Sequence, residues 1–159
     1  YSITKCAGED LVKMYYQLYG METVCLRYFN VYGDRQPIKG QYAPVIGLFM
    51  RQQAANEPMT IVGDGKQRRD FTHVYDICGG LIAISQGDWG VAAFNLGTGT
   101  NHSINELAAM FGGETKYIPQ REGEARITLA DISKTTELTG WKPCHNLHEY
   151  VKGIKNEVN

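Results

Sequence analysis

A tyrosine and a lysine open the chain four residues apart, as Tyr1 and Lys5. On a helix this spacing places both side chains on one face, with their Cβ atoms roughly 5–6 Å apart. A nearby ammonium favours the phenolate, so a tyrosine with an ordinary pKa near ~10 removes a hydroxyl proton more readily at neutral pH. Because the spacing is also common on ordinary helices, it indicates acid–base chemistry only together with other motifs.

The hydrophobic pattern predicts the elements that would position this pair. Apolar residues recur at helical spacing over residues 2–19, Gly20 provides a stop, and Thr23–Tyr28 is typical of a strand buried on both faces. Further helices are predicted at 44–55, 76–85, 103–111 and 131–138, with a last helix after residue 146. Strands are predicted between them, at 59–62, 69–74, 91–96 and 115–118. Such alternation predicts an α/β protein.

Composition limits the classes of function. The chain has 159 residues, 43% of them hydrophobic, which is enough for a sizeable core. A net charge of −1 predicts no nucleic-acid partner, and no apolar run approaches the roughly 18 residues of a membrane helix. There is no signal-peptide pattern and the four cysteines are far apart, so we expect a cytoplasmic protein without disulfides. His145 and His148 flank the start of a predicted surface helix, and no metal site is expected.

Several motifs, taken in order, resemble one family. They are the Tyr1/Lys5 pair, the run from Arg27 to Gly33, residues 63–76, the run from Asn95 to Gly99, and Ser133-Lys134 ahead of Gly140-Trp141-Lys142-Pro143. The set resembles the extended short-chain dehydrogenase/reductases of the NAD-dependent epimerase/dehydratase family, which act on nucleotide sugars. Residues 40–46 look most like the UDP-N-acetylglucosamine/UDP-glucose 4-epimerases.

The resemblance implies the C-terminal half of such an enzyme, with a remnant of a Rossmann parallel sheet and a small α/β substrate-binding subdomain. Residues 1–32 and 74–97 would belong to the NAD-binding Rossmann half, and residues 33–73 and 98–159 to the nucleotide-sugar-binding subdomain. A Rossmann half normally opens with a glycine-rich loop for the pyrophosphate, and the sequence contains none. Because the sequence also begins with Tyr1 rather than Met, we expect a further segment upstream.

Residue roles follow from the resemblance, position by position. Tyr1 corresponds to the general acid/base, and Lys5 to the lysine that lowers its pKa and bonds the nicotinamide ribose. Tyr28 and Phe29 would line the nicotinamide pocket and complete the expected NAD site. The expected nucleotide-sugar site consists of Asn30, Val45, Phe49, Thr60, Val62, Arg69, Arg121 and Glu124.

The chemistry of the charged residues agrees with these roles. Arg69 and Arg121 carry planar, always charged groups that suit the oxygens of a diphosphate, and the carboxylate of Glu124 can accept from a ribose diol. The family more usually has aspartate at the position of Glu124. Taken singly, Arg121 would more often be a solvated surface charge and Tyr28 as often a core residue, so the ordered set carries the assignment.

The implied reaction is the 4-epimerisation of a UDP-sugar. Tyr1 would take a proton from the sugar hydroxyl while hydride passes to NAD, and hydride would return to the opposite face of the 4-keto sugar. A 4,6-dehydratase, decarboxylase or reductase of the same family is an alternative, as is a non-catalytic nucleotide-sugar-binding or assembly module. This chain alone is expected neither to bind NAD tightly nor to turn over substrate. The first helix and the strands near Val24 and Phe94 would normally pack against parallel strands that this sequence lacks. The apolar faces and strand edges left uncovered predict self-association, for example as a homo-oligomer.

Overall fold

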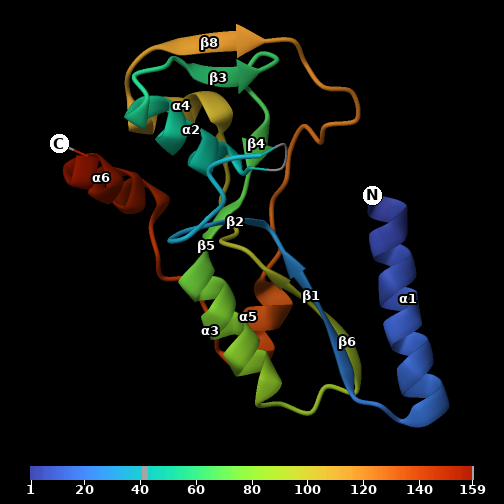
Figure 1. Cartoon of the computed structure of the whole chain (residues 1–159). Helices are drawn as coiled ribbons and strands as arrows, with labels where there is room; N and C mark the ends of the chain where they lie inside the picture. The colour runs from blue at the N-terminus through green and yellow to red at the C-terminus, as the bar shows by residue number, and fades with distance from the viewer. Residues whose placement is uncertain (41–42, 159) are drawn as a thin grey trace.

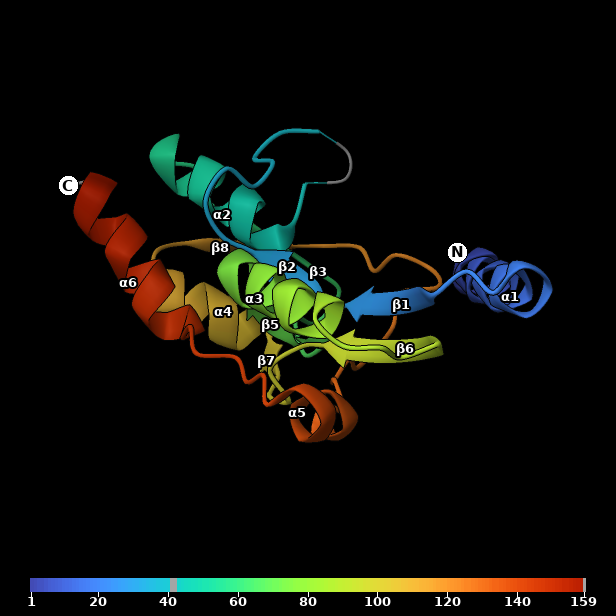
Figure 2. The same cartoon turned by 90° about the horizontal axis from the view of Figure 1, so that it is seen from below.

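The computed structural model describes residues 1–40 and 43–158, with only the backbone for residues 155–158, and confirms the α/β class (Figures 1 and 2). The helices are α1 (Ser2–Tyr19), α2 (Val45–Ala54), α3 (Val74–Ser85), α4 (Ile104–Phe111), α5 (Ser133–Thr139) and α6 (Leu147–Val158). The strands are β1 (Thr23–Tyr28), β2 (Asn30–Tyr32), β3 (Met59–Val62), β4 (Arg68–Arg69), β5 (Phe71–His73), β6 (Val91–Leu96), β7 (His102–Ser103) and β8 (Thr115–Ile118).

The strands form four pairs. Three are parallel, β1 with β6, β2 with β5 and β3 with β8, whereas β4 and β7 are antiparallel. Helix α3 connects β5 to β6, which pair with β2 and β1 respectively. The β1/β6 pair is in register over its whole length, from Thr23 opposite Val91 to Tyr28 opposite Leu96. These pairs make up a partial Rossmann-like fold.

Two hydrophobic cores lie under these elements. The first, at the lower end in Figure 1, joins β6, α3 and the segment after α5, and consists of Ile77, Ile84, Phe94, Leu96 and Trp141. The second, at the upper end, joins α2, β3, α4 and α6; its largest fully buried side chains include Phe49, Phe111, Ile61, Leu107 and Val151. Residues of β2 and β5, such as Tyr32 and Phe71, belong to the second core. The domain limits at 32/33, 73/74 and 97/98 stay a prediction.

Helix α1 packs along β1 and β6 without burying any of its residues (Figure 1). It ends at Gly20, whose φ of 63° is the left-handed conformation that glycine adopts without steric cost. A two-pronged ion pair joins Arg27 of β1 to Glu9, with Nε–Oε1 and Nη2–Oε2 distances of 2.6 and 2.5 Å. The hydroxyl of Thr23 also donates to the Val12 carbonyl at 3.3 Å. Polar contacts therefore contribute much of the docking of α1.

The buried carboxylate of Asp70, between β4 and β5, links three segments that are far apart in the sequence. It accepts hydrogen bonds from the backbone N–H groups of Thr98, Gly99 and Ala130, at 2.8, 3.0 and 3.1 Å. The Thr98 hydroxyl donates to the same group at 2.7 Å. Gly97 lies so close that an added Cβ would collide with the Ala130 side chain, so the turn after β6 needs glycine there.

Most local predictions agree with the structure, with exceptions. The expectation that Thr23–Tyr28 is buried on both faces is wrong, since no residue of β1 is fully buried, and the short strands β2 and β7 were not predicted. The Ser103 capping box is confirmed, since its hydroxyl accepts from Glu106 N at 3.1 Å and the Glu106 carboxylate accepts from Ser103 N at 2.9 Å. The predicted strand over residues 69–74 is divided, because Asp70 turns inward between β4 and β5. Helix α3 begins at Val74 rather than residue 76, because the ring of His73 caps it by accepting from Tyr75 N.

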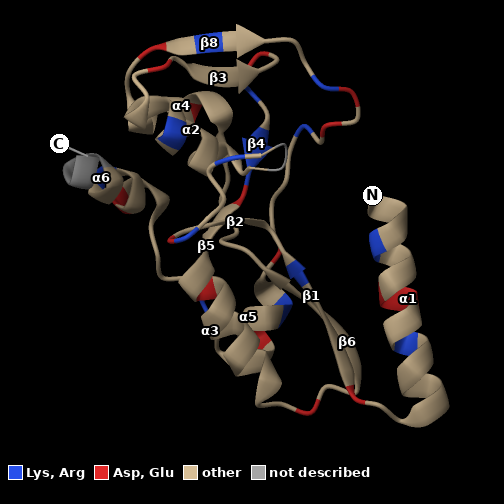
Figure 3. Ribbon diagram, viewed as in Figure 1, with Lys and Arg blue, Asp and Glu red and all other residues tan. Residues whose placement is uncertain are grey.

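Charges of both signs lie along the loop that follows β8, and both signs also occur on α1 (Figure 3). Among the described residues, no helix is sufficiently long and apolar to cross a membrane.

Candidate functional site

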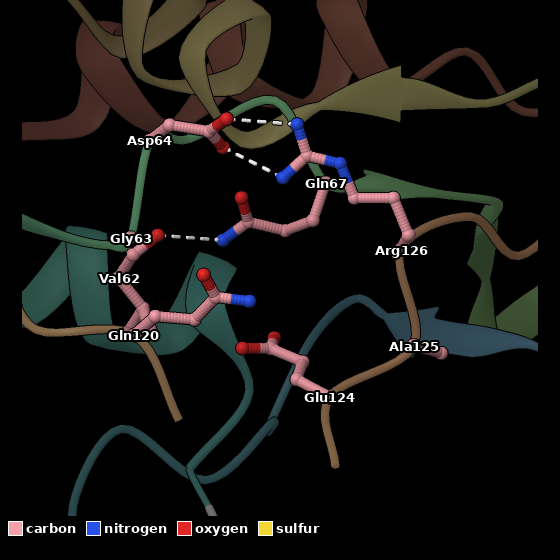
Figure 4. A pocket seen from close by; sticks show the side chains of 8 residues that line it. All are labelled: Val62, Gly63, Asp64, Gln67, Gln120, Glu124, Ala125 and Arg126. Carbon is pink, nitrogen blue, oxygen red and sulfur yellow. Dashed lines mark hydrogen bonds and ion pairs between the residues drawn. The ribbon is translucent and has the colours of Figure 1, made fainter. Parts of the chain in front are cut away.

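A small pocket of about 10 Å³ opens where β3 ends, between the turn at Gly63 and the loop after β8 (Figure 4). Its lining comprises Val62, Gly63, Asp64, Gln67, Gln120, Glu124, Ala125 and Arg126. Backbone pairing to β4 positions the far end of this loop, because Arg68 N donates to Arg126 O at 2.9 Å and Thr128 N donates to Arg68 O at 3.0 Å. The pocket is therefore built from segments more than 50 residues apart, held together by a short strand.

Arg69 and Glu124 form an ion pair beside this pocket. Arg69 Nη2 donates to Glu124 Oε1 at 2.9 Å, with the two side chains 10% and 32% exposed. The neighbouring Nη1 donates to the Arg68 carbonyl at 2.9 Å, which orients the guanidinium. Two of the charged residues predicted for the nucleotide sugar are thus in contact, and their partly buried position makes the pair less screened by solvent than a surface pair.

A second ion pair closes another side of the pocket. Arg126 donates to both carboxylate oxygens of Asp64 at 2.8 Å, as Figure 4 shows. These bonds hold the pKa of Asp64 well below its usual range, so the group stays ionised at neutral pH. Gln67 is buried and its amide donates to the Val62 carbonyl at 2.9 Å. The sequence reasoning missed Gln67, Gln120 and Arg126, whose place in the pocket depends on the pairing of β4 with the distant loop.

The remaining residues predicted for the nucleotide sugar lie in different surroundings. Asn30 is exposed, and its side-chain oxygen accepts from the hydroxyl of Thr128 at 3.3 Å. Thr60 is bound through its hydroxyl and backbone N–H to Gln52, at 3.0 and 3.1 Å. Arg121 is exposed in the loop, at the surface beside Gln120.

Helix α2 carries the last two of these residues. Val45 is half-buried at its first turn. Phe49 is 0% exposed, and its ring meets Phe111 edge-on with the centroids 5.8 Å apart, so it offers no surface to a ligand and the expected direct contact is wrong for this structure. Of the 40–46 motif, positions 41 and 42 lie outside the described residues.

The expected acid–base pair lies at the beginning of α1. Tyr1 is 93% exposed, and the ammonium of Lys5 lies 5.3 Å from the centre of its ring. In the described part of the chain, no hydrogen bond or ion pair joins either residue to Arg69 or Glu124. However, α1 begins on the side of the molecule towards which the loop after β8 extends, in both views (Figures 1 and 2).

The aromatic residues predicted for the nicotinamide lie where β1 ends. Tyr28 is 48% exposed and Phe29 is half-buried, next to Gly97. In α/β folds ligands bind outside the carboxyl ends of parallel strands, and Tyr28 and Leu96 are the carboxyl ends of β1 and β6. The residues present therefore fit the nicotinamide end of a dinucleotide, but the chain has no glycine-rich sequence for its pyrophosphate.

Comparisons with known proteins agree with this geometry. Residues 1–97 match the NAD dependent epimerase/dehydratase family. A putative UDP-glucose 4-epimerase of Methanocaldococcus jannaschii is 42% identical over 100% of this chain and 52% of its own length, and UDP-glucuronic acid decarboxylase 4 of Arabidopsis thaliana is 33% identical over 90% of this chain and 33% of its own length.

Solved structures give the same result. The UDP-glucose 4-epimerase of Thermotoga maritima with UDP-glucose superposes with a TM-score of 0.89 at 30% identity, over 100% of this chain and 54% of that protein. The UDP-glucuronic acid 4-epimerase of Bacillus cereus with UDP-glucuronic acid and NAD gives a TM-score of 0.86 at 29% identity, over 98% of this chain and 51% of that protein.

The chain thus spans about half the length of most of these relatives. The match to the family covers more than half of the chain, and the relatives are similar over nearly all of it. The chain therefore belongs to the NAD-dependent epimerase/dehydratase family of extended short-chain dehydrogenase/reductases, of which it represents a C-terminal portion.

Proposed function

We propose that this chain supplies the acid–base pair and the nucleotide-sugar-binding residues of an NAD-dependent UDP-sugar 4-epimerase. The observation that carries the proposal is the contact between Arg69 and Glu124 beside the pocket of Figure 4, because these residues were expected to bind the two polar parts of one nucleotide. The similarity to 4-epimerases over the whole chain supports it. A decarboxylase is the second candidate, favoured by the 33% identical plant relative.

In the proposed complex the nucleotide lies across the pocket. The guanidinium of Arg69 has N–H groups beyond those bound to Glu124 and the Arg68 carbonyl, and these donate to the diphosphate. The free oxygen of Glu124 accepts from a ribose hydroxyl, Val62 packs against the base, and Thr60 supports β3 through its bonds to Gln52. Arg121, free to reach from the exposed loop, adds a second cation, whereas Asn30 and Val45 complete the sugar side.

Catalysis in this proposal begins at the start of α1. Tyr1 binds the sugar hydroxyl at C4 through its phenol oxygen, and it takes and later returns the hydroxyl proton. Lys5, one helical turn further along α1, places its ammonium 5.3 Å from the centre of this ring. NAD, when bound, supplies the hydride acceptor and donor for C4. Tyr28 and Phe29 form a partly exposed aromatic surface that keeps the reacting carbon in a near-attack position.

This role requires residues that the sequence does not contain. A glycine-rich turn normally seats the dinucleotide pyrophosphate at a helix N-terminus, and an acidic residue holds its ribose. We therefore propose that residues 1–32 and 74–97 complete a Rossmann half, that residues 33–73 and 98–159 bind the nucleotide sugar, and that this chain alone binds UDP weakly, does not retain NAD and does not turn over substrate.

We predict that Arg69 and Glu124, which together form the proposed nucleotide clamp, control the affinity for the nucleotide. Replacing Arg69→Ala should weaken UDP binding to this chain by about 10–100-fold, because a hydrogen bond to a charged group is worth roughly 1.5–3 kcal/mol. Glu124→Gln removes both the ion pair with Arg69 and the proposed ribose contact, and because pyrophosphate has no ribose, this variant should weaken UDP more than it weakens inorganic pyrophosphate. Isothermal titration calorimetry measures both, with Arg51→Ala on α2 as the control. Equal affinities for the three variants and the unaltered chain would refute the clamp.

We predict the reaction class from product analysis of the intact enzyme. UDP-glucose, UDP-N-acetylglucosamine and UDP-glucuronate should give products of unchanged mass with C4 inverted, and Tyr1→Phe should lower kcat by roughly 10²–10⁴-fold because it removes the acid–base group. Mass spectrometry and sugar NMR measure both. Loss of carbon dioxide from UDP-glucuronate would instead establish the decarboxylase, and retained activity in Tyr1→Phe would reject the assignment of Tyr1.

We also propose that α1 causes self-association. Its residues Ile3, Leu11 and Leu18 are 81%, 55% and 64% exposed, and such apolar surface favours burial against another chain. Sedimentation velocity should therefore show dimers or larger species that become monomers in the Leu11→Glu/Leu18→Glu double variant. Asp10→Lys, a charge change on the same helix, should leave the association unchanged. A strictly monomeric unaltered chain at high concentration would disprove the proposal.

A further inference from the structure

Three side chains with different metal-binding atoms meet at the beginning of α3, away from the nucleotide pocket. Asp76 lies in the first turn of α3, while Cys144 and His145 lie in the segment that leads into α6. Asp76 Oδ1 is 2.7 Å from His145 Nδ1 and 3.2 Å from Cys144 Sγ, and these two atoms are 3.4 Å apart. One oxygen, one sulfur and one nitrogen therefore form a compact triangle.

Backbone contacts hold the triangle in place. The carboxylate of Asp76 accepts from Cys144 N and His145 N, each at 3.1 Å, and the indole of Trp141 donates to the Asp76 carbonyl at 3.0 Å. The ring of His145 stacks on that of His73, with the centroids 4.3 Å apart and the planes 15° apart. The three groups are thus positioned before any ligand arrives, which reduces the entropy that binding must overcome.

We propose that Asp76, Cys144 and His145 bind a divalent cation with borderline-soft preference, Zn²⁺ being the best match, with water at the fourth position. Zn²⁺ takes sulfur at about 2.3 Å, and nitrogen and oxygen at about 2.0–2.2 Å, so tetrahedral ligands lie roughly 3.3–3.6 Å apart. The Sγ distances are within about 0.2–0.3 Å of this spacing, and only His145 Nδ1 must move outward from Asp76, by about 0.6 Å.

The charge and exposure of the groups suit such a site. Asp76 is 3% exposed, and its carboxylate accepts hydrogen bonds from the Cys144 thiol and the His145 imidazole. One cation would replace these two hydrogen bonds while the hydrogen bonds from the backbone persist. A carboxylate and a thiolate together neutralise a divalent cation. Cys144 and His145 are both exposed, which gives the cation a route in and leaves room for water.

The cation would act as a structural link. Asp76 belongs to the first hydrophobic core region through α3, whereas the segment after Cys144 leads to α6, whose Leu147 and Val151 belong to the second core. Binding therefore fastens the docking of α6 to α3 and raises the unfolding temperature.

The sequence reasoning expected no metal site and assigned His145 only to a helix start. An adjacent Cys-His pair does not match the sequence spacings by which zinc sites are usually recognised, and the third ligand lies 68 residues from Cys144. Only the fold therefore brings the three residues together.

The test uses the whole chain with Co²⁺ and Zn²⁺ as probes. Co²⁺ should produce a thiolate-to-cobalt charge-transfer band in the near ultraviolet that saturates at one ion per chain and disappears on addition of Zn²⁺. Cys144→Ser and His145→Gln should each weaken Co²⁺ binding at least about tenfold, because even loss of an outer partner of a ligand costs roughly 10–100-fold. Both positions are exposed, so the variants should keep the circular dichroism of the unaltered chain.

Matched controls are Cys78→Ser, an exposed cysteine on α3, and His148→Gln, three residues beyond His145; both should bind Co²⁺ as the unaltered chain does. Zn²⁺ should also raise the unfolding temperature of the unaltered chain and of both controls, but not that of Cys144→Ser or His145→Gln. The proposal is overturned if no cobalt–thiolate band develops, or if the band persists in Cys144→Ser.

Discussion

The buried carboxylate of Asp70 is the interaction on which the arrangement of the site depends. It receives three backbone N–H groups from two distant segments, the turn after β6 and the strand-like return of the loop after β8. A carboxylate without exposure to water is stable only when such donors surround it. Asp70 therefore fixes the positions of Thr98, Gly99 and Ala130 relative to β4, and with them the junction between the two hydrophobic cores.

Arg69 follows from the same constraint. Because neighbouring side chains of an extended segment point in opposite directions, the inward direction of Asp70 directs Arg69 towards the pocket. The returning loop is paired to β4 through Arg68 and Thr128, so Glu124 reaches Arg69 from the other side. Sequence positions 55 residues apart thus form one charged contact, which is the geometric basis for the proposed nucleotide clamp.

Short-range sequence patterns predicted most helices and strands, whereas the packing of side chains at the site could be seen only in the structure. The α/β class, the end of α1 at Gly20 and the Ser103 capping box follow from short-range patterns, and the ordered motifs identified the family correctly. The start of α3 differed because a histidine, rather than a residue typical of caps, accepts the first N–H. Phe49 was assigned to a ligand although tertiary packing places it in the core, and the pocket residues Gln67 and Arg126 depend on long-range strand pairing that no local pattern encodes.

The most direct measurement is the free energy of unfolding of Asp70→Asn, from urea denaturation. An amide keeps the size of the carboxylate but turns N–H groups towards buried N–H donors, so we predict a loss of roughly 3 kcal/mol. Asp10→Asn, which removes only a surface contact to Lys13 at 3.6 Å, should change stability by less than about 0.5 kcal/mol. An unfolding free energy for Asp70→Asn equal to that of the Asp10→Asn control would contradict the role of Asp70.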